Sequence, residues 1–283
     1  MPETIFIKMV NDEGKVRDSY TDYWTLINLS GYKTCALSEM DFASDNVYIF
    51  SPDDGNSKAH FTQDKAKDRK CKVVLLQLEW PTWKDGVLSG HEVPDYVDEM
   101  WICDVAYFVF QKMHNPNRHK IQEFFLGGHP NFGNHDYANN KVIWDFCHLS
   151  YVYGMREHKM RILADRGFTF GPNAWGEERE KVLRSCRWGL HLHQRPLPWL
   201  APQRFLLFAS YGLPIITDPL DYSDPYKVFQ DGLIHFDPRE TSVMNDAIRR
   251  DAVEHNFHLV REERPFKNEV DEGVAILLEN SNA

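Results

Sequence analysis

Three arginines stand where apolar runs give way to helical patterns in the second half of the chain. Arg156 follows the run 141–150, Arg195 follows the run 188–194, and Arg204 opens the next helical stretch. A guanidinium binds phosphate oxygens bidentately, and helix N-termini add free N–H donors. The arrangement predicts a site that holds a diphosphate and stabilises the charge that develops on it as it leaves. For each arginine alone, a salt bridge at a helix start is the alternative.

Other polar residues lie at the same junctions between strand and helix. They complete the set that we predict to bind the donor, the compound that carries the diphosphate. Gly154 precedes the first helix, His193 and Gln194 end the run 188–194, and Asp218 ends the run 213–218. His191 and His193 alternate along one predicted strand, so their side chains share a face. We expect them to contact the substrate, and His191 is also a catalytic candidate. A hydrogen-bonded core residue is the alternative for a strand histidine.

Transfer of a group to a hydroxyl needs a base that takes the hydroxyl proton. Asp12 and Glu13 follow the first apolar run and are the candidate bases, with Asp41 as a further option. An ordinary acidic turn is the alternative. The acceptor is the compound that receives the transferred group. Trp80 and Trp83 could supply flat faces that stack on it, and packing at the rim between two lobes is the alternative.

A basic run gives a second acceptor-side candidate. Between residues 58 and 72, two acids face six basic residues: Lys58, Lys65, Lys67, Arg69, Lys70 and Lys72. This run predicts either a solvated face or a patch for a polyanionic acceptor such as DNA, with Lys67 and Arg69 as contacts. The formal net charge of -10 disfavours non-specific nucleic-acid binding by the protein as a whole.

The elements that must position these residues follow from hydrophobic periodicity. Short apolar runs alternate with amphipathic spacers, as in β-α units built on a parallel sheet. We expect strands over the following ranges: 4–10, 46–52, 72–81, 105–111, 141–150, 168–171, 188–194, 213–218 and 233–237. We expect helices over these: 19–32, 155–167, 176–186, 202–212, 240–257 and 266–281, with a helix or lid at 91–100.

The pattern weakens between residues 112 and 140, where we place a boundary between two lobes, with the segment 129–137 as the hinge. We expect an N-terminal lobe over 1–139, a second lobe over 140–262 and a C-terminal helical segment over 263–283. The segment 129–137 contains His and Asp, but its spacing matches no metal site that we can justify.

Composition narrows the class of protein. Hydrophobic residues make up 42% and charged residues 26% of 283 residues, as in ordinary globular proteins. No apolar run is long enough for a membrane span, and no signal-peptide pattern opens the sequence, so we expect a cytoplasmic protein. The five cysteines are widely spaced without a CxxC pair, which predicts reduced thiols rather than disulfides or a zinc site.

Four segments in a fixed order resemble a known family: YGMREHKMRILADRGFTFG, GEEREKVLRSCRWGLHLHQ, RFLLFASYGLPIITD and DGLIHF. Together they resemble the C-terminal lobe of GT-B glycosyltransferases, most closely the CgeB-like branch named for spore-maturation proteins. Arg156 matches the family's first turn, and Arg204 and Gly212 match its Arg-helix-Gly stretch. Many retaining relatives hold the donor ribose with a glutamate five residues before that glycine, where this chain has Leu207.

The resemblance implies an α/β fold of GT-B architecture, with two Rossmann-like lobes whose parallel sheets face each other across a cleft. It implies an N-terminal acceptor-binding lobe, a sugar-nucleotide lobe, and a C-terminal helix that crosses back. The implied activity is metal-independent hexosyl or pentosyl transfer, with no cofactor and with a nucleoside diphosphate sugar, UDP-sugar favoured, as co-substrate.

The acceptor, the sugar, the stereochemical outcome and the oligomeric state stay open at the level of the sequence. Acceptor candidates are a polysaccharide, a metabolite, a protein, or a hydroxymethylated base in viral DNA. Two other functions fit the same fold: a sugar-nucleotide epimerase or hydrolase, and a non-catalytic binding module.

Overall fold

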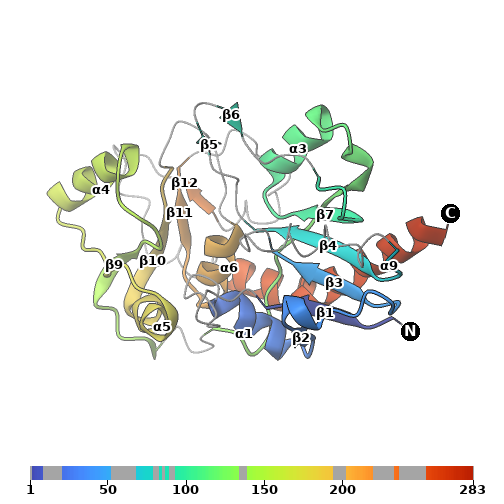
Figure 1. Cartoon of the computed structure of the whole chain (residues 1–283). Coiled ribbons are helices and arrows are strands. Elements are labelled where there is room, and N and C mark those ends of the chain that lie inside the picture. The colour runs from blue at the N-terminus through green and yellow to red at the C-terminus, as the bar shows by residue number, and fades with distance from the viewer. Residues whose placement is uncertain are drawn as a thin grey trace. The chain divides into compact units, whose positions relative to one another are not determined.

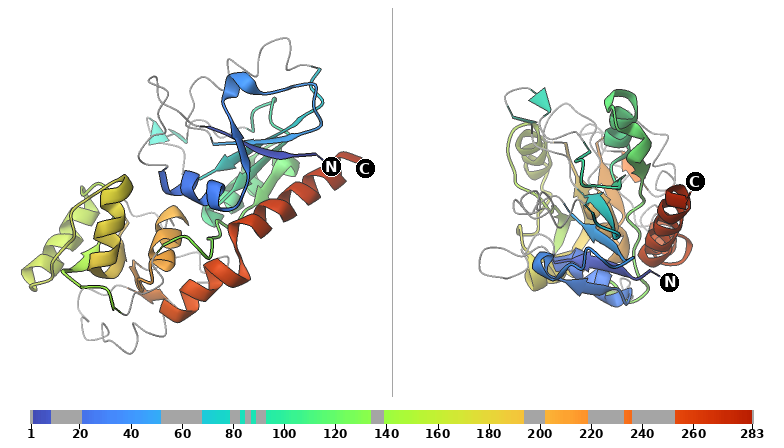
Figure 2. Two further views of the ribbon diagram at one scale, coloured as in Figure 1. Left: turned by 90° about the horizontal axis from the view of Figure 1, so that it is seen from below. Right: turned by 45° about the vertical axis from the view of Figure 1, so that its right-hand side comes forward.

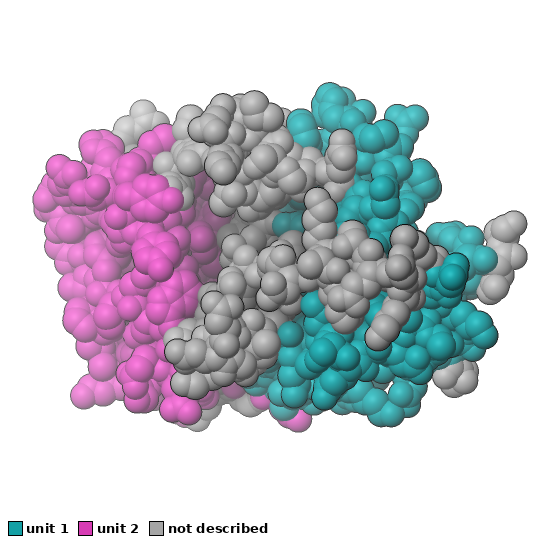
Figure 3. Space-filling view, viewed as in Figure 1, with its two compact units in different colours: residues 1–126, 267–283 teal, residues 127–266 magenta. Residues whose placement is uncertain are grey.

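The chain forms two compact units, described here from a computed structural model (Figure 1; Figure 3). Unit 1 comprises residues 1–126 and 267–283, and unit 2 comprises residues 127–266. The structure describes these residues: 2–8, 21–51, 68–78, 83–84, 87–88, 93–133, 139–193, 202–218, 233–235 and 253–282. No helix among them is long and apolar enough to cross a membrane.

Unit 1 is built on a parallel sheet of six strands in the order β2-β1-β3-β4-β7-β8. The strands are β1 (Thr4–Ile7), β2 (Lys33–Cys35), β3 (Val47–Phe50), β4 (Lys72–Gln77), β7 (Glu99–Ile102) and β8 (Ile121–Glu123). A separate antiparallel pair joins β5 (Trp83–Lys84) to β6 (Val87–Leu88). Every strand of the large sheet runs the same way, so its carboxyl ends meet at one edge.

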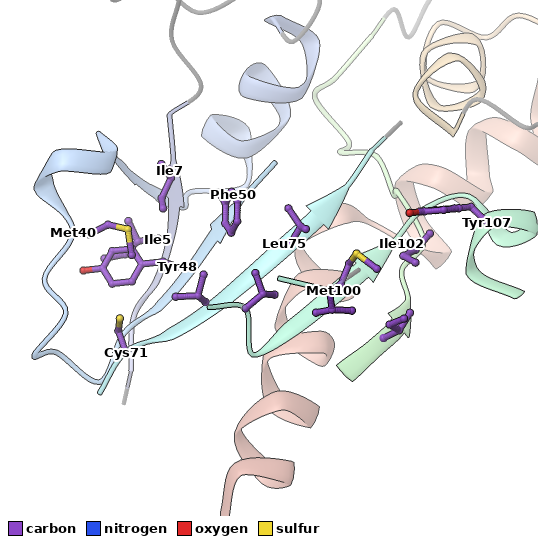
Figure 4. Packing of buried hydrophobic residues seen from close by; sticks show 14 residues of the cluster. Ile5, Ile7, Met40, Tyr48, Phe50, Cys71, Leu75, Met100, Ile102 and Tyr107 are labelled. Carbon is purple, nitrogen blue, oxygen red and sulfur yellow. The ribbon is translucent and has the colours of Figure 1, made fainter. Parts of the chain in front are cut away.

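One face of this sheet carries a continuous apolar core (Figure 4). Alternate residues of four neighbouring strands point into it, which is the period expected when one face of a strand is buried against a layer of helix or loop. They include Ile5, Tyr48, Leu75 and Met100, and Tyr107 of helix α3 (Val105–His114) packs against them.

The opposite face is covered by α1 (Thr21–Leu29) and by the C-terminal helix α9 (Phe266–Asn282) (Figure 2). The ring of Phe6 meets Tyr23 of α1 edge to face, with 6.3 Å between centroids. The Trp101 ring packs against the backbone of α9 at Gly273, where an added Cβ would lie 2.8 Å from the indole. These contacts place the C-terminal helix in the core of unit 1.

Two predicted elements of unit 1 were wrong. Residues 105–111, predicted as a strand, belong to α3, and the Asp104 side chain caps this helix by accepting a hydrogen bond from the Tyr107 amide at 2.9 Å. Residues 99–100, predicted as part of a helix or lid, begin strand β7. The capping aspartate outweighs the strand-like composition of VAYFVF, because it satisfies helical N–H groups that a strand start would not present.

Unit 2 is built on a parallel sheet of four strands in the order β12-β11-β10-β9. The strands are β9 (Trp144–Cys147), β10 (Cys186–His191), β11 (Ile215–Thr217) and β12 (Leu233–His235). A parallel bridge between Phe146 and Phe170 adds the segment 168–170 on the far side of β9. From β9 the chain passes first to the segment 168–170 on one side of this strand. It then crosses to β10 on the other side and continues to β11 and β12.

Helices flank both faces of this sheet. On one face, Leu163 of α4 (Met155–Asp165) packs in a cluster with Phe146, Trp188 and Leu190. On the other, Phe208 of α6 (Pro202–Ser210) lies against Gly189, where an added Cβ would approach the ring to 2.4 Å. Helix α5 (Gly176–Ser185) leads directly into β10. The helices predicted at 155–167, 176–186 and 202–212 are confirmed.

The reversal of strand order fixes where a ligand site is expected. In open parallel sheets, loops diverge where the order reverses, which opens a crevice outside the carboxyl ends of the strands. In unit 2 this point lies beyond β9 and β10. The segments that leave the strands at this edge are residues 148–154 after β9, residues 192–193 after β10 and Asp218 after β11.

Candidate functional site

Two guanidinium groups converge on one hydroxyl at the carboxyl ends of the unit 2 strands. Arg156 Nη1 donates to Ser150 Oγ at 2.8 Å, and Arg204 Nη2 donates to the same atom at 3.0 Å. Ser150 follows β9, Arg156 lies in the first turn of α4, and Arg204 in the first turn of α6. The fold therefore brings two of the sequence-predicted arginines together. Two like charges this close to one neutral oxygen form a favourable place for an anion.

Arg156 is held rigidly, because the protein itself uses most of its donors. Its side chain is 4% exposed, its Nε donates to the Leu192 carbonyl at 3.0 Å, and its Nη1 also donates to the Tyr151 carbonyl. Burial lowers the pKa of Arg156, although the carboxylate of Asp218 favours the charged form. The Nη2 group is the part of this guanidinium that bonds to no described residue, so it is the part that could meet a ligand.

Gly154 sets the direction in which the chain enters α4. Its backbone has φ 62° and ψ −136°, a conformation that residues with a Cβ rarely adopt. No side chain caps the N-terminus of this helix. The free N–H groups of its first turn therefore lie beside Ser150 and Arg156, and they add positive partial charge to the same corner.

Asp218 ties three elements of the site together. Its Oδ1 accepts a hydrogen bond from Lys159 Nζ of α4 at 2.6 Å, and its Oδ2 accepts one from the His193 amide at 2.7 Å. The carboxylate is 3% exposed, so these contacts replace the water that it would otherwise bind. Asp218 thus fixes α4 and the end of β10 relative to β11.

Two buried histidines lie beside the arginines as neutral rings. Burial, followed by the nearby charge of Arg156, lowers the pKa of His148 to about 3. Burial, followed by the charge of Arg204, lowers the pKa of His191. At neutral pH both rings act through hydrogen bonds and not as cations.

The hydrogen bonds of these rings also indicate their tautomers. His148 Nδ1 lies 3.2 Å from the Leu190 carbonyl, which can only accept, so Nδ1 carries the proton. His191 Nδ1 lies 3.2 Å from Thr217 Oγ1, which donates its own proton to the Asp218 carbonyl at 3.1 Å. His191 Nδ1 must therefore donate as well. In both rings the lone pair is left on Nε2.

An aromatic pair borders the arginine corner. The Tyr151 ring, in a side chain that is 67% exposed, lies 6.4 Å from the Trp175 ring. The guanidinium of Arg179 stacks on Trp175 at 4.3 Å from the ring centroid and is anchored to the Ala174 carbonyl. Tyr151 neighbours Ser150 in the chain, and its carbonyl binds Arg156. Flat apolar surface therefore stands next to the anion-binding corner.

The remaining residues predicted from the sequence are placed elsewhere or not described. Arg69 pairs with Asp98 at 2.8 Å, beside the start of β4. Asp41 accepts a hydrogen bond from the Ala43 amide in a turn close to Tyr48 near the start of β3. The backbone of Trp83 lies in β5. These predicted residues fall outside the described part of the chain: Asp12, Glu13, Lys67, Trp80, Gln194 and Arg195.

Sequence reasoning missed several residues of this corner: His148, Ser150, Lys159 and Trp175. His148 and Ser150 lay inside the predicted strand 141–150, which ends three residues earlier in the structure, at Cys147. The polar ending HLS was the signal that could have found them. Trp175 gave a weaker signal, as an aromatic residue directly before a helix with two acids in its first turn.

No group of three His, Cys, Asp or Glu side chains that could hold a metal ion occurs in the described ranges. Of the segment 129–137, predicted as the hinge, residues 129–133 are described. His129 there accepts a hydrogen bond from the Asn131 amide through its Nδ1, and its carbonyl accepts one from Arg261 of the π-helix η6 (Leu259–Glu263).

Known proteins give a match in structure but not in sequence. No protein-family model matches the chain, and no curated protein matches it in sequence. HepE from Anabaena, solved in complex with UDP and glucose, is similar with a TM-score of 0.59 and 10% identity, over 99% of this chain and 100% of that one. AviGT4, a glycosyltransferase involved in avilamycin A biosynthesis, is similar with a TM-score of 0.58 and 10% identity, over 98% of each chain.

A third solved structure, of accessory secretory proteins from Streptococcus pneumoniae, has a TM-score of 0.50 and 11% identity over 93% of this chain. The present chain spans 58% of the length of that protein. At these identities the likeness concerns the fold. The predicted fold class is confirmed: this chain has the α/β fold of the GT-B glycosyltransferases, with a parallel sheet in each of its two units.

Proposed function

We propose that the protein is a glycosyltransferase that takes a sugar from a nucleoside diphosphate sugar, with a UDP-sugar favoured, and that unit 2 is its donor-binding unit. The observation that carries the proposal is the pair of guanidiniums on Ser150, at the point where the strand order of unit 2 reverses. The GT-B fold and the UDP bound to HepE support the choice of donor. Unit 1 would then bind the acceptor. Membership of the CgeB-like branch stays a prediction.

In this reaction, the acceptor oxygen forms a bond to the anomeric carbon of the sugar, and the bond from that carbon to the diphosphate oxygen breaks. The electron pair of the broken bond passes to the β-phosphate, and the acceptor proton passes to a base. Arg156 Nη2, Arg204 and the N-terminus of α4 would stabilise the charge on the leaving diphosphate. Asp12 and Glu13 remain the proposed bases.

Several neighbours of the arginines would hold or order the donor. Asp218 would act by positioning, because both of its oxygens already accept hydrogen bonds from Lys159 and His193. Gly154 would aim the helix N-terminus. A base works best with a pKa near the working pH, so the lowered pKa of His191 supports a hydrogen-bonding role toward the sugar over proton removal.

Tyr151 and Trp175 would contact the nucleobase. Every nucleobase has a flat face that can stack on an exposed aromatic ring, and this contact is worth about 1–3 kcal/mol per base. The pair stands beside the corner that would hold the diphosphate, which is where a base on the same nucleotide must lie. The cation of Arg179 behind Trp175 keeps that ring oriented.

Calorimetric titration with UDP, GDP, ADP and UDP-glucose tests the proposal. We expect UDP and UDP-glucose to bind, and Arg204→Ala to weaken both by about 10-fold or more, since hydrogen bonds to charged groups are worth about 1.5–3 kcal/mol. Arg161→Ala is the matched control, because Arg161 lies on the exposed side of α4 with 66% of its side chain accessible. The absence of any nucleotide binding at millimolar concentration would refute a donor site.

The same ligands and the Arg204→Ala variant, with the reaction products analysed, separate the proposal from its alternatives. An epimerase or hydrolase would isomerise or release the sugar from UDP-glucose with no acceptor present, which product analysis by chromatography detects. A non-catalytic module that has kept only the architecture of the lobe would be indifferent to Arg204→Ala, whereas a donor site would lose affinity. Transfer that requires an acceptor and is lost in Arg204→Ala supports a transferase.

A further inference from the structure

We propose that His148 is a specificity-determining residue of the donor site, whose Nε2 accepts a hydrogen bond from a hydroxyl of the bound sugar nucleotide. This inference rests on the proposed function, and it assigns a role to a residue that the phosphate-binding argument does not use. The ring follows β9 at the carboxyl edge of the unit 2 sheet, two residues before Ser150, which binds the two arginines.

The ring of His148 is locked in one orientation and one tautomer. Its Nδ1–H bond to the Leu190 carbonyl bridges β9 to β10 at the reversal of strand order. Since the imidazole nitrogens lie on opposite sides of the ring, Nε2 points away from that carbonyl. The charges of Arg156 and Arg204 disfavour a proton on the ring. Ser150, which accepts hydrogen bonds from both guanidiniums, follows His148 by two residues.

This lone pair has no hydrogen-bond partner in the described part of the chain. The side chain is 3% exposed, so bulk water does not replace the missing bond. Buried polar atoms are nearly always satisfied, and exceptions cluster where a ligand or an ordered water completes the bond. A ligand that fits this corner brings a negative group for the guanidiniums and a hydrogen-bond donor for Nε2 of His148.

A sugar nucleotide brings its donors in the required place. Its diphosphate oxygens carry no proton at neutral pH, so they cannot donate to Nε2. Hydroxyls flank the diphosphate on both sides, those of the ribose on one and those of the sugar on the other. The base N–H lies farther from the diphosphate and beside the aromatic pair. A hydroxyl is therefore the donor that reaches His148 when the diphosphate occupies the arginine corner.

The experiment compares ligands that lack one hydroxyl donor at a time. The probes are UDP, 2′-deoxy-2′-fluoro-UDP, 3′-deoxy-3′-fluoro-UDP, N3-methyl-UDP, UDP-glucose, and UDP-glucose analogues with one sugar hydroxyl each replaced by fluorine. Calorimetry gives the affinity of each for the wild type and for His148→Asn. Asparagine keeps an N–H donor near the position of Nδ1, for the Leu190 carbonyl, and deletes Nε2. His158→Asn, on the exposed side of α4, is the matched control.

We expect one hydroxyl-deleted ligand to bind the wild type about 5- to 150-fold more weakly than its parent, which is the range for leaving a buried acceptor unpaired. In His148→Asn that penalty should shrink to within about twofold, while the control keeps it. The ribose analogues and the sugar analogues tell which hydroxyl is read. His148→Gln, which restores a polar atom near the position of Nε2, should recover part of the discrimination.

Three results would overturn the inference. In the first, every analogue keeps its wild-type penalty in His148→Asn. In the second, the variant loses affinity for all ligands by one common factor, which indicates a structural role. In the third, only N3-methyl-UDP shows a penalty that depends on His148, which assigns the contact to the base. In each case the parent UDP still binds, so the proposed function stands. A wild type that binds none of UDP, GDP, ADP and UDP-glucose would refute both.

Discussion

Burial sets the charge state of the side chains at the unit 2 corner. Arg156 stays a cation despite its burial because a guanidinium loses its proton only at high pH. Burial lowers the pKa of His148 and of His191, so both rings are neutral at pH 7. The one described carboxylate that touches the corner, Asp218, is already paired with Lys159. The corner thus combines fixed positive charge with neutral acceptors, which suits a ligand that carries both phosphate and hydroxyl groups.

The neutral state of His148 predicts a dependence of stability on pH. The unfolded ring takes up a proton as the pH falls through 6.5, but the folded ring stays neutral down to about 3. The folded state therefore binds fewer protons across this window, and its stability is full above 6.5 and declines as the pH falls toward 3. Between pH 7.5 and pH 5 the loss from this ring is about 2 kcal/mol.

Urea unfolding at several pH values checks this expectation. His148→Asn should lower stability at pH 7.5, and its stability should fall by about 2 kcal/mol less than that of the wild type on going to pH 5. The comparison cancels carboxylates and other histidines, which titrate alike in both proteins. Parallel slopes for His148→Asn and the wild type would show that His148 takes up its proton at the same pH in the folded and the unfolded states.

Part of this corner could be predicted from the residues alone. Arg156 and Arg204 were predicted as members of one site because each opens a helix after a strand, and parallel strands bring such corners to one edge. His148 and Ser150 were not, because the strand end is set by hydrogen bonds to β10, which the apolar run does not encode. The tautomer of His148 depends on a carbonyl 42 residues away along the chain, a contact that no local pattern carries.

At the scale of the elements, a helix and a sheet approach each other closely at two glycine residues, which have no side chain. Gly189 in the centre of β10 lets the Phe208 ring of α6 rest on the strand. Gly273 in α9 does the same for Trp101 of β7, a ring that is 1% exposed and stacked on Phe124 at 5.2 Å. The helix can lie this close because neither glycine has a Cβ.

Gly273→Ala should therefore destabilise the protein even though alanine favours helix by about 1 kcal/mol. The added Cβ would lie 2.8 Å from the Trp101 ring, which its neighbours hold in place. Overpacking of this kind costs about 1–3 kcal/mol. Thermal unfolding followed by tryptophan fluorescence measures the change. Ala275→Gly, on the exposed side of the same helix, isolates the propensity effect; a Gly273→Ala variant that unfolds at a higher temperature than the wild type would show that Trp101 can move.

Elements with one dominant signal were predicted well, and elements with competing signals were not. The helices α4, α5 and α6 combine helical periodicity with glycine or proline punctuation, so their ranges followed from the residues. Strand β2 has three residues, Lys33–Cys35, at a sheet edge with no buried residue, and no local pattern predicted it. Helix α3 opens with mostly β-favouring residues, and two features that favour a helix compete with them: the Asp104 cap and the burial of Tyr107 and Gln111 four residues apart.

At the scale of the whole molecule, the two units repeat one order of strands without a repeat in sequence. In unit 1 the chain goes from β1 to β2 on one side and then to β3 on the other. In unit 2 it goes from β9 to the segment 168–170 on one side and then to β10 on the other. Each unit thus has its own reversal point, and that of unit 1 lies beyond β1 and β3. The predicted bases Asp12 and Glu13 follow β1 in the chain and lie outside the described residues.

The net charge of -10 predicts how the chain would behave toward a DNA acceptor. Any transfer to hydroxymethylated DNA should depend on the basic run 58–72 against overall repulsion, so its rate should fall steeply between 50 and 200 mM salt, by about 10-fold or more. Transfer of labelled glucose from UDP-glucose measures this, with a hydroxymethylated and an unmodified duplex compared. Activity on DNA that is insensitive to salt would count against a role for the basic run.

The membership of α9 in unit 1 has a consequence for how the chain is made. A ribosome delivers all strands of unit 1 first, then the whole of unit 2, and only afterwards the helix that closes over Trp101 and Glu99. Unit 2 is contiguous and can complete its core while unit 1 still waits for its last layer. During that interval the face of the nascent first unit that carries Trp101 stays uncovered, and exposed apolar surface of this kind favours aggregation.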